Sequence, residues 1–205
     1  GTRRFHRYQH QPQDKNSLVD NRVISITQDN TGLIWLGTFG GLNKFDPANT
    51  RFGQVRHDPT NANSLSQGRV QAIFKDSKEL LWIGTDTAGL NRYDPKQDQF
   101  THYRHAPDNP QSLSNNNVSA IFEDSLGILW VGTENAGLNR LNPADNSFTH
   151  YRFDETNRHN LSDDVVIAIH EDSLGKLWIG TANGLNLFNR QHQTFSHFTY
   201  SAENH

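Results

Sequence analysis

The sequence predicts an all-β protein built from repeated four-stranded units, and three observations support this fold class. A tryptophan recurs at intervals of 47, 48 and 48 residues, at Trp35, Trp82, Trp130 and Trp178. A phenylalanine keeps the same spacing, at Phe5, Phe52, Phe100, Phe148 and Phe195. Each period is rich in strand-forming residues and has almost no helical periodicity. A repeat of this length with four short strands is typical of the blades of a β-propeller.

The first repeat shows its four strands in order. The segment "RVISITQ" (22–28) is β-branched and apolar, and the turn "DNTG" leads from it into "LIWLGT" (33–38). A glycine bend then opens "GLNKF" (41–45), and the turn "DPANT" precedes "RFGQVRH" (51–57). Turn signals at such short intervals separate short strands. The repeats therefore predict four blades, at about 22–57, 69–105, 117–153 and 165–200.

The segments outside these blades have their own pattern. Long polar links join the blades at 57–67, 105–115 and 153–163, and we expect a recurring leucine in them to anchor each link. The segment "FHRYQH" (5–10) matches the last strand of a repeat, which predicts a leading strand without its own blade. We interpret residues 1–205 as four complete blades plus this strand, a fragment of a larger propeller. The absence of Met fits a piece excised from a longer protein.

Composition excludes several classes of function. The formal net charge is −3, and Lys and Arg are scattered, so no basic surface for nucleic acid is expected. No apolar run approaches the roughly 20 residues of a membrane helix, so we expect no direct membrane insertion in this segment. The lack of Cys excludes disulfides and thiolate metal sites and leaves the compartment open.

The recurring aspartates and tryptophans are interpreted as structural. An Asp in the first position of a hairpin turn accepts backbone N–H hydrogen bonds, whereas a calcium site needs several converging oxygen ligands. Glu79 stands where the other repeats have Gly, so a strained turn is expected there. The tryptophans could serve as ligand platforms, but their apolar neighbours favour burial between blades. The aspartates in question are Asp29, Asp76, Asp124 and Asp172.

Cofactor, metal and catalytic sites are not expected. A phosphate-binding glycine loop needs a helix after it, but here a strand follows, so the glycines are predicted to allow close packing between blades. Histidines that recur in phase, such as His102 and His150, lie about a blade apart and cannot share one metal ion. No singular carboxylate pair or nucleophile interrupts the repeat, which predicts a non-catalytic chain.

The repeated pattern V-x-x-I-x-x-D-x-x-G-x-L/I-W-x-G-T-x-x-G-L-N-x-F/Y-D-P resembles the two-component regulator propeller repeat. Its departures are Glu79, Asn142, Asn189 and Arg190. The resemblance implies a periplasmic sensor region of a bacterial hybrid histidine kinase or diguanylate cyclase. Such a region binds an extracellular cue, often a saccharide, and signals to an enzyme module outside this chain. The first repeat carries the pattern through Val23, Ile26, Asp29, Gly32, Trp35, Gly37, Thr38, Gly41, Leu42 and Asn43.

The candidate ligand-binding residues vary between repeats while the scaffold does not. They lie where the link into the first strand meets the bend between strands two and three, two places that share one face of a propeller. Such variation fits a site built on a repeat, and it equally fits exposed loops that vary freely. The candidates are Arg22, Phe39, Arg69, Asp86, Glu134, Asn135 and Asn183.

Two functions remain open at this point. The first is a ligand-sensing module for a saccharide or other small extracellular ligand, which would show a funnel lined by polar and aromatic groups. The second is a structural propeller that contacts other proteins through an edge or a face. In either case the uncovered sides of the first and last blades predict a homo-oligomer, most simply a two-fold dimer.

Overall fold

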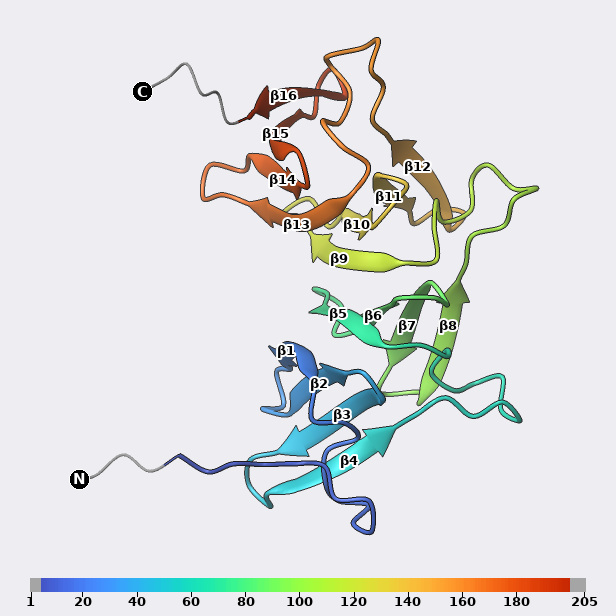
Figure 1. Ribbon diagram of the computed structural model, residues 1–205, viewed down its shortest axis with the longest axis vertical. Coiled ribbons are helices and arrows are strands. Elements are labelled where there is room, and N and C mark those ends of the chain that lie inside the picture. Colours follow the sequence, from blue (N-terminus) through green and yellow to red (C-terminus); the bar gives the residue numbers. More distant parts are fainter. Residues whose placement is uncertain (1–4, 200–205) are drawn as a thin grey trace.

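The computed structural model describes residues 5–199, which form four antiparallel sheets of four strands each and no helix (Figure 1). Within each sheet the strands follow one another in chain order, so each blade is a simple meander. This confirms the predicted all-β propeller architecture of four four-stranded blades. Among the described residues there is accordingly no helix of the length and apolarity that a membrane crossing requires.

The strands are five or six residues long. The first blade contains β1 (Val23–Gln28), β2 (Ile34–Thr38), β3 (Gly41–Asp46) and β4 (Arg51–Val55). The second contains β5 (Val70–Lys75), β6 (Leu81–Thr85), β7 (Leu90–Asp94) and β8 (Gln99–Tyr103). The third contains β9 (Val118–Glu123), β10 (Leu129–Thr133), β11 (Leu138–Asn142) and β12 (Ser147–Tyr151). The fourth contains β13 (Val166–Glu171), β14 (Leu177–Thr181), β15 (Gly184–Asn189) and β16 (Thr194–Phe198).

The expected leading strand over residues 5–10 does not form, so this prediction was wrong. A strand needs a partner for its backbone N–H and C=O groups, and no sheet of the described chain accepts this segment. Side chains hold it instead. The Tyr8 ring lies 5.3 Å from both the Phe45 and Phe52 rings, and His10 Nδ1 is 2.6 Å from the Leu18 carbonyl oxygen.

Neighbouring blades lock together through one glycine and one valine. A Cβ built on Gly84 of β6 would lie 2.5 Å from Val118 Cγ1 of the next blade, and one on Gly132 would lie 2.5 Å from Val166 Cγ1. Both valines are completely buried, and a β-bulge follows each of them in the first strand of its blade. Only a residue without a side chain can accept this valine, which confirms the predicted close packing at these glycines.

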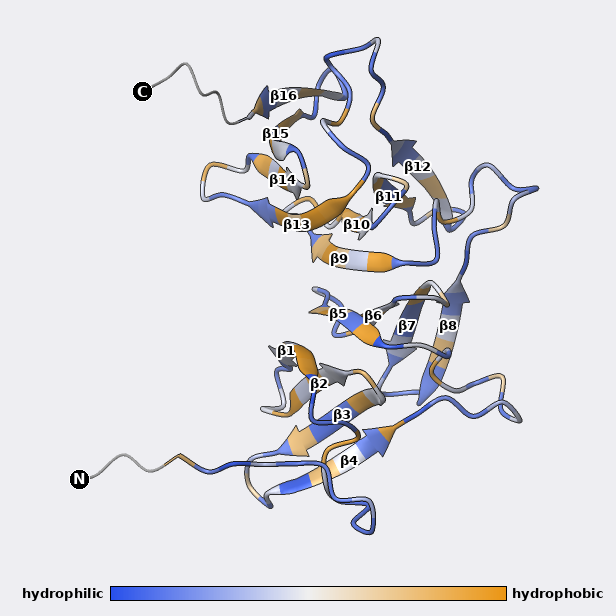
Figure 2. Ribbon diagram, in the orientation of Figure 1, coloured by the Kyte–Doolittle hydropathy of each residue, from blue (hydrophilic) through white to orange (hydrophobic). Residues whose placement is uncertain are grey.

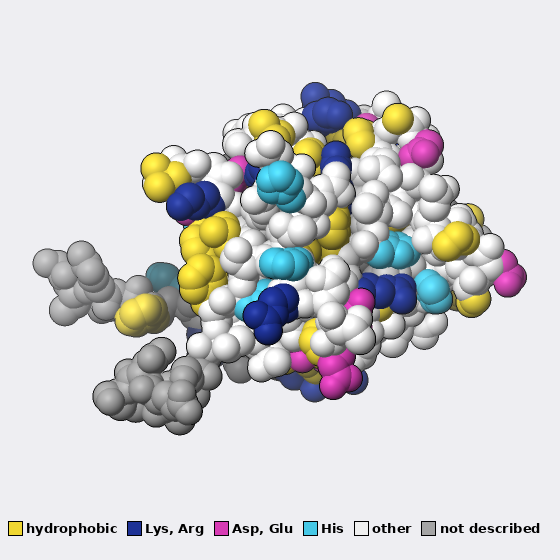
Figure 3. All heavy atoms as spheres, turned by 90° about the horizontal axis from the view of Figure 1, so that it is seen from above, with side chains coloured by type: hydrophobic (Ala, Val, Ile, Leu, Met, Phe, Trp, Pro, Cys, Tyr) yellow, Lys and Arg dark blue, Asp and Glu magenta, His cyan; other side chains and the backbone are white. Residues whose placement is uncertain are grey.

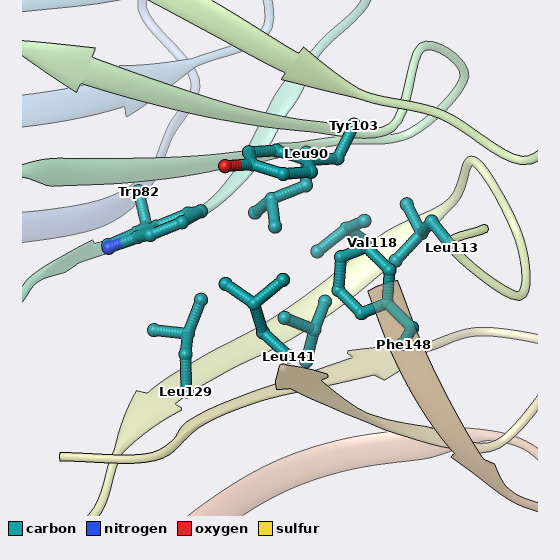
Figure 4. Close-up of a cluster of buried hydrophobic side chains, with 9 residues drawn as sticks. Trp82, Leu90, Tyr103, Leu113, Val118, Leu129, Leu141 and Phe148 are labelled. Carbon is teal, nitrogen blue, oxygen red and sulfur yellow. The ribbon is translucent and has the colours of Figure 1, made fainter. Parts of the chain in front are cut away.

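The core therefore lies between the blades. Between the second and third blades, Trp82 and Tyr103 face Leu129, Leu141 and Phe148 of the next blade (Figure 4). In Figure 2 orange segments occur on strands of all four blades. The link leucines Leu18, Leu65, Leu113 and Leu161 are all buried, as expected of anchors.

Burial of the repeated tryptophan depends on whether a next blade covers it. Trp35, Trp82 and Trp130 are 1%, 4% and 1% exposed, as predicted. Trp178 is only partly buried, which differs from the prediction. Within the described residues no further blade packs on this side of β14.

The two ends of the array expose apolar side chains. On the first blade Val23 is 42% exposed and Ile26 is 65% exposed. On the fourth blade Ile167 and Phe198 are 60% and 51% exposed, and Figure 3, which looks onto this end, shows hydrophobic side chains at the surface. In Figure 1 the blades follow an arc whose two ends do not meet.

Candidate functional site

Each blade is braced by a hydrogen bond from its tryptophan to its turn aspartate. In the third blade Asp124 Oδ2 accepts from Trp130 Nε1 at 2.7 Å, while Oδ1 accepts from the backbone N–H groups of Leu126 and Ile128, both at 3.0 Å. Burial acts to raise the pKa of Asp124, but the bonds from Trp130 and Arg190 outweigh it, so the pKa lies below its usual value. The structural interpretation of the aspartate is confirmed. The sequence analysis did not foresee that the aspartate also accepts a hydrogen bond from the indole N–H.

The asparagine of the repeated "GLN" segment fastens the polar link to the blade. Asn139 is completely buried. Its Oδ1 accepts from the Ser114 N–H at 2.9 Å, and its Nδ2 donates to Ser114 Oγ at 2.8 Å and to the Val131 carbonyl at 3.1 Å. Sequence reasoning missed this role, although the invariance of the asparagine across the four repeats was a signal that could have revealed it.

The in-phase histidines also hold the links. His102 Nε2 lies 2.9 Å from the Ser64 carbonyl oxygen, and His150 Nε2 lies 2.7 Å from that of Ser112. A second series uses Nδ1, for example His105, which lies 2.9 Å from the Leu113 carbonyl oxygen. Their recurrence is therefore explained by backbone hydrogen bonding.

The candidate ligand-binding residues do share one face. In each blade the residue after the conserved threonine donates its backbone N–H to the residue that precedes the first strand. The Phe39 N–H donates to the Arg22 carbonyl at 3.3 Å, and the Asp86 N–H donates to that of Arg69 at 3.1 Å. The Glu134 N–H bonds to Asn117 in the same way, at 3.1 Å. Link and bend thus lie side by side.

Four of the seven candidates gather at the junction of the first two blades. The Phe39 ring lies between two guanidinium groups, with Arg22 Cζ 4.0 Å and Arg69 Cζ 4.7 Å from its centroid. Arg69 Nε lies 3.4 Å from Asp86 Oδ2, and Asp86 Oδ1 accepts the Arg69 backbone N–H at 2.9 Å. Phe39, Arg69 and Asp86 line an open hollow of about 440 Å³, which Arg56 and Gln67 also border.

The other three candidates are not part of this hollow. Glu134 and Asn135 belong to the third blade and Asn183 to the fourth, and all three side chains are exposed. Glu134 accepts a hydrogen bond from the Asn117 side chain. Across the described chain, the side chains of Asn135 and Asn183 have no hydrogen bond that would fix them.

Sequence reasoning overlooked the basic residues that complete this face. A second hollow of about 380 Å³ adjoins the first and is bordered by Arg104 and Asn116, and it shares Gln67 with the first. Arg56 and Arg104 stand in phase in the repeat, 48 residues apart, and so do not stand out as singular residues. With Arg69 they give the two hollows three guanidinium groups against the single carboxylate of Asp86.

Four meander blades joined by valine–glycine contacts define a β-propeller repeat protein. The model of the two component regulator propeller family matches residues 17–40, 64–87, 112–135 and 160–183, one segment for each blade. The chain therefore carries four repeats of the two component regulator propeller family. No curated protein matches the sequence at a significant level.

Solved structures of extracellular domains are similar to this chain. One is from BT3049 of B. thetaiotaomicron, described as a hybrid two component system, with 30% identity, a TM-score of 0.64, and coverage of 86% of this chain and 30% of that one. Another is from BT4673 of the same organism, described as a one component system, with 25% identity, a TM-score of 0.70, and coverage of 84% and 22%. This chain thus spans less than a third of either neighbour's length.

Enzymes share the fold as well. Virginiamycin B lyase from Staphylococcus aureus aligns with a TM-score of 0.67 over 94% of this chain and 58% of its own, at 15% identity. A likeness at that identity concerns the propeller architecture alone.

Proposed function

We propose that this chain is a non-catalytic ligand-sensing propeller module of a bacterial signal-transduction protein, and that it acts in the periplasm. The family match in every blade supports a sensor module. The two neighbours described as extracellular domains of signalling systems support a position outside the cytoplasm. The kinase or cyclase that receives the signal would belong to another part of a membrane-anchored parent protein.

The observation that carries the ligand proposal is the Phe39 ring held between Arg22 and Arg69. The ring holds the two guanidinium groups at this junction through cation–π contacts, and guanidinium groups suit carboxylate or sulfate groups. The three arginines of the two hollows outnumber Asp86, so the ligand of this face would be an acidic saccharide or another small anionic molecule.

Calorimetric titration with short acidic and neutral oligosaccharides tests this proposal. We expect the acidic series to bind, and we expect Phe39→Ala or Arg69→Ala to weaken binding by roughly tenfold or more. Arg69→Ala removes a charge-assisted contact, and Phe39→Ala removes the ring that positions Arg22 and Arg69. Asn183→Ala, on the same face but far from the hollow, is the control. Equal affinity for neutral sugars would contradict the anionic preference. Absence of binding by the whole panel would instead favour a propeller that only contacts other proteins.

A further inference from the structure

The opposite face of the propeller contains a second kind of junction, where the Asp turn of one blade meets the next blade. Between the third and fourth blades this junction is filled by Arg190. Its Nη1 lies 2.6 Å from Asp124 Oδ2, and its Nη2 lies 2.7 Å from Glu171 Oε1. The two carboxylates are 0% and 8% exposed, and the arginine is 26% exposed. A guanidinium group is therefore clamped between two buried carboxylates of neighbouring blades.

The junction between the second and third blades repeats this clamp without its arginine. Asp76 and Glu123 are the counterparts of Asp124 and Glu171. Glu123 is held as Glu171 is: the Ser77 N–H and Oγ donate to it at 2.6 and 3.1 Å, and those of Ser125 donate to Glu171 at 2.6 and 3.0 Å.

At the position of Arg190 this junction has Pro143, which has no charge to offer. A cavity of about 140 Å³ lies there, bordered by Asp76, Glu123 and Pro143 and by the apolar side chains of Trp82, Leu129 and Leu141. The cavity is large enough for a guanidinium group, which has only four non-hydrogen atoms.

Two cations of the chain already stand near this cavity, and neither replaces Arg190. Arg92 borders it, and its Nη2 donates to Thr101 Oγ1 at 3.2 Å. Its counterpart in the next repeat is Arg140, which coexists with Arg190, so an arginine at this strand position leaves room for a second guanidinium. Lys78 borders the cavity with an exposed side chain, where the next repeat has Leu126.

The junction between the first and second blades offers different chemistry. Lys75 stands where the other two junctions have Glu123 and Glu171. Its Nζ lies 3.2 Å from Glu79 Oε1 and also donates to the Asn30 side chain at 2.5 Å. Among the junctions of the described residues, a pair of carboxylates occurs between the second and third blades and between the third and fourth. An arginine of the chain bonds to both carboxylates only between the third and fourth blades.

We propose that the cavity between the second and third blades is a binding site for a guanidinium group, such as the side chain of an arginine in a peptide ligand. Asp76 and Glu123 would each accept a charge-assisted hydrogen bond, as Asp124 and Glu171 do from Arg190. This site is independent of the hollow beside Phe39, because it lies on the other face and recognises a cation.

The indole N–H resonances give a direct test. Trp82 Nε1 donates to Asp76 Oδ2 at 2.7 Å, so a ligand on that carboxylate should shift the Trp82 indole signal in ¹⁵N-correlated NMR spectra. We expect L-arginine in the millimolar range to shift Trp82 in a saturable way and to leave Trp130 unchanged. L-citrulline, which has a neutral urea in place of the guanidinium, is the control and should leave Trp82 unchanged. No shift of Trp82 with arginine, or an equal shift with citrulline, would overturn the proposal.

Three variants sharpen the test. Glu123→Gln should weaken arginine binding by roughly tenfold or more, since one charged acceptor is lost. Pro143→Arg should fill the cavity from within the chain and abolish the arginine response of Trp82. Arg190→Ala should open the third junction, so that Trp130 begins to respond. In each variant unchanged Trp35 and Trp178 resonances verify the fold. Arginine binding by Pro143→Arg with unchanged affinity would contradict the assigned position.

Discussion

Glu79 shows how one residue can depart from a repeat and remain tolerated. Its φ is +69°, in the left-handed region that its counterparts Gly32, Gly127 and Gly175 occupy at +88°, +73° and +75°. The expected strain is therefore present. Its carboxylate compensates in part, because it pairs with Lys75 at 3.2 Å and accepts a hydrogen bond from Asn30 of the first blade.

We predict that Glu79→Gly changes the free energy of unfolding by the backbone strain relieved minus the ion pair lost. Relief of the left-handed conformation is worth about 1 kcal/mol, and the partly exposed ion pair is worth about 0.2–1 kcal/mol. The variant should thus be as stable as the wild type or more stable, by up to about 1 kcal/mol, in urea unfolding. In a Lys75→Met background the gain from Glu79→Gly should be larger, because the ion pair is already absent. A clear loss of stability in both backgrounds would show that the turn is not strained.

The tryptophans differ in how much they contribute to the core. Trp130 is 1% exposed and lies 5.1 Å from the Phe188 ring of the next blade, whereas Trp178 is only partly buried. We predict that Trp130→Ala lowers the free energy of unfolding by about 3–5 kcal/mol and that Trp178→Ala lowers it by distinctly less. Urea unfolding followed by circular dichroism measures both. Equal losses would contradict the dependence on the neighbouring blade.

Residue roles were predictable where a side chain acts within its own repeat. The Asp turn and the positive φ at Glu79 followed from turn chemistry alone. The clamp around Arg190 did not, because it joins residues 66 positions apart and depends on how two blades meet.

Among the elements, the polar links are held by more hydrogen bonds than their composition suggests. The link before the third blade is fastened by Asn139, His150 and the buried Leu113. The link is thus an ordered part of the blade junction.

We predict that Asn139→Ala loosens this link. The substitution leaves the buried Ser114 N–H without its partner, at about 1–3 kcal/mol, and also removes a hydrogen bond to the Val131 carbonyl. Amide hydrogen exchange of residues 105–117 should become faster, and the whole protein should be less stable by at least that order. The exposed Asn135→Ala of the same blade is the control. Unchanged exchange in the link would show that its anchoring rests on leucine alone.

The same link gives stability a dependence on pH. Burial lowers the pKa of His150, and the hydrogen bond to Ser112 offsets this only in part. The unfolded chain, with the ordinary histidine pKa of about 6.5, therefore binds a proton at a higher pH than the folded one. The contribution of His150 is complete above that pKa and is lost as the pH falls below it.

We accordingly expect the free energy of unfolding to decrease between pH 7.5 and 5.5, and His150→Gln to flatten this slope. Substitution of the exposed His192 by Gln should leave the slope unchanged. Chemical denaturation at several pH values provides the measurement. An identical slope in the wild type and His150→Gln would contradict the assignment.

Strand positions were predictable from turn signals, because each turn is specified by residues next to it. The segment 5–10 shows the limit of this approach. Its sequence matches the β4-type strands, but a strand also requires a partner, and pairing is a property of the sheet and not of the segment. The matching pattern alone could not reveal whether that partner was present.

At the scale of the whole molecule, the valine–glycine contact decides which substitutions the array tolerates. A Cβ on Gly132 would lie 2.5 Å from Val166 Cγ1, but one on Gly180 would have no neighbour closer than Ala168 Cβ at 3.7 Å. We predict that Gly132→Ala markedly destabilises the protein and that Gly180→Ala leaves the isolated chain as stable as before. Thermal unfolding at low protein concentration compares them. A similar decrease in melting temperature for both variants would show that the glycines are needed for the backbone geometry of the strand and not for the contact with valine.

The homo-oligomer expected from the sequence remains a prediction. The structure suggests its contact: the exposed Val23 of one copy would pack into the space beside Gly180 of another. We expect light scattering at micromolar concentration to give a mass above 23.3 kDa, and Gly180→Ala to lower it. Phe39→Ala, on the ligand-candidate face, is the control. A mass of 23.3 kDa for the wild type would refute self-association.

The paired glycine and valine also give the array a polarity. Each contact has two different sides: the valine of a first strand projects, and the glycine of a second strand leaves the space that receives it. In the described chain the valine of the first blade, Val23, is exposed, and the glycine of the last blade, Gly180, has no valine packed against it. Two first blades, or two last blades, would bring like surfaces together and leave the glycine space empty. Association of two copies through these ends would therefore be head-to-tail, and repetition of that step would either close into a ring or continue as a helix.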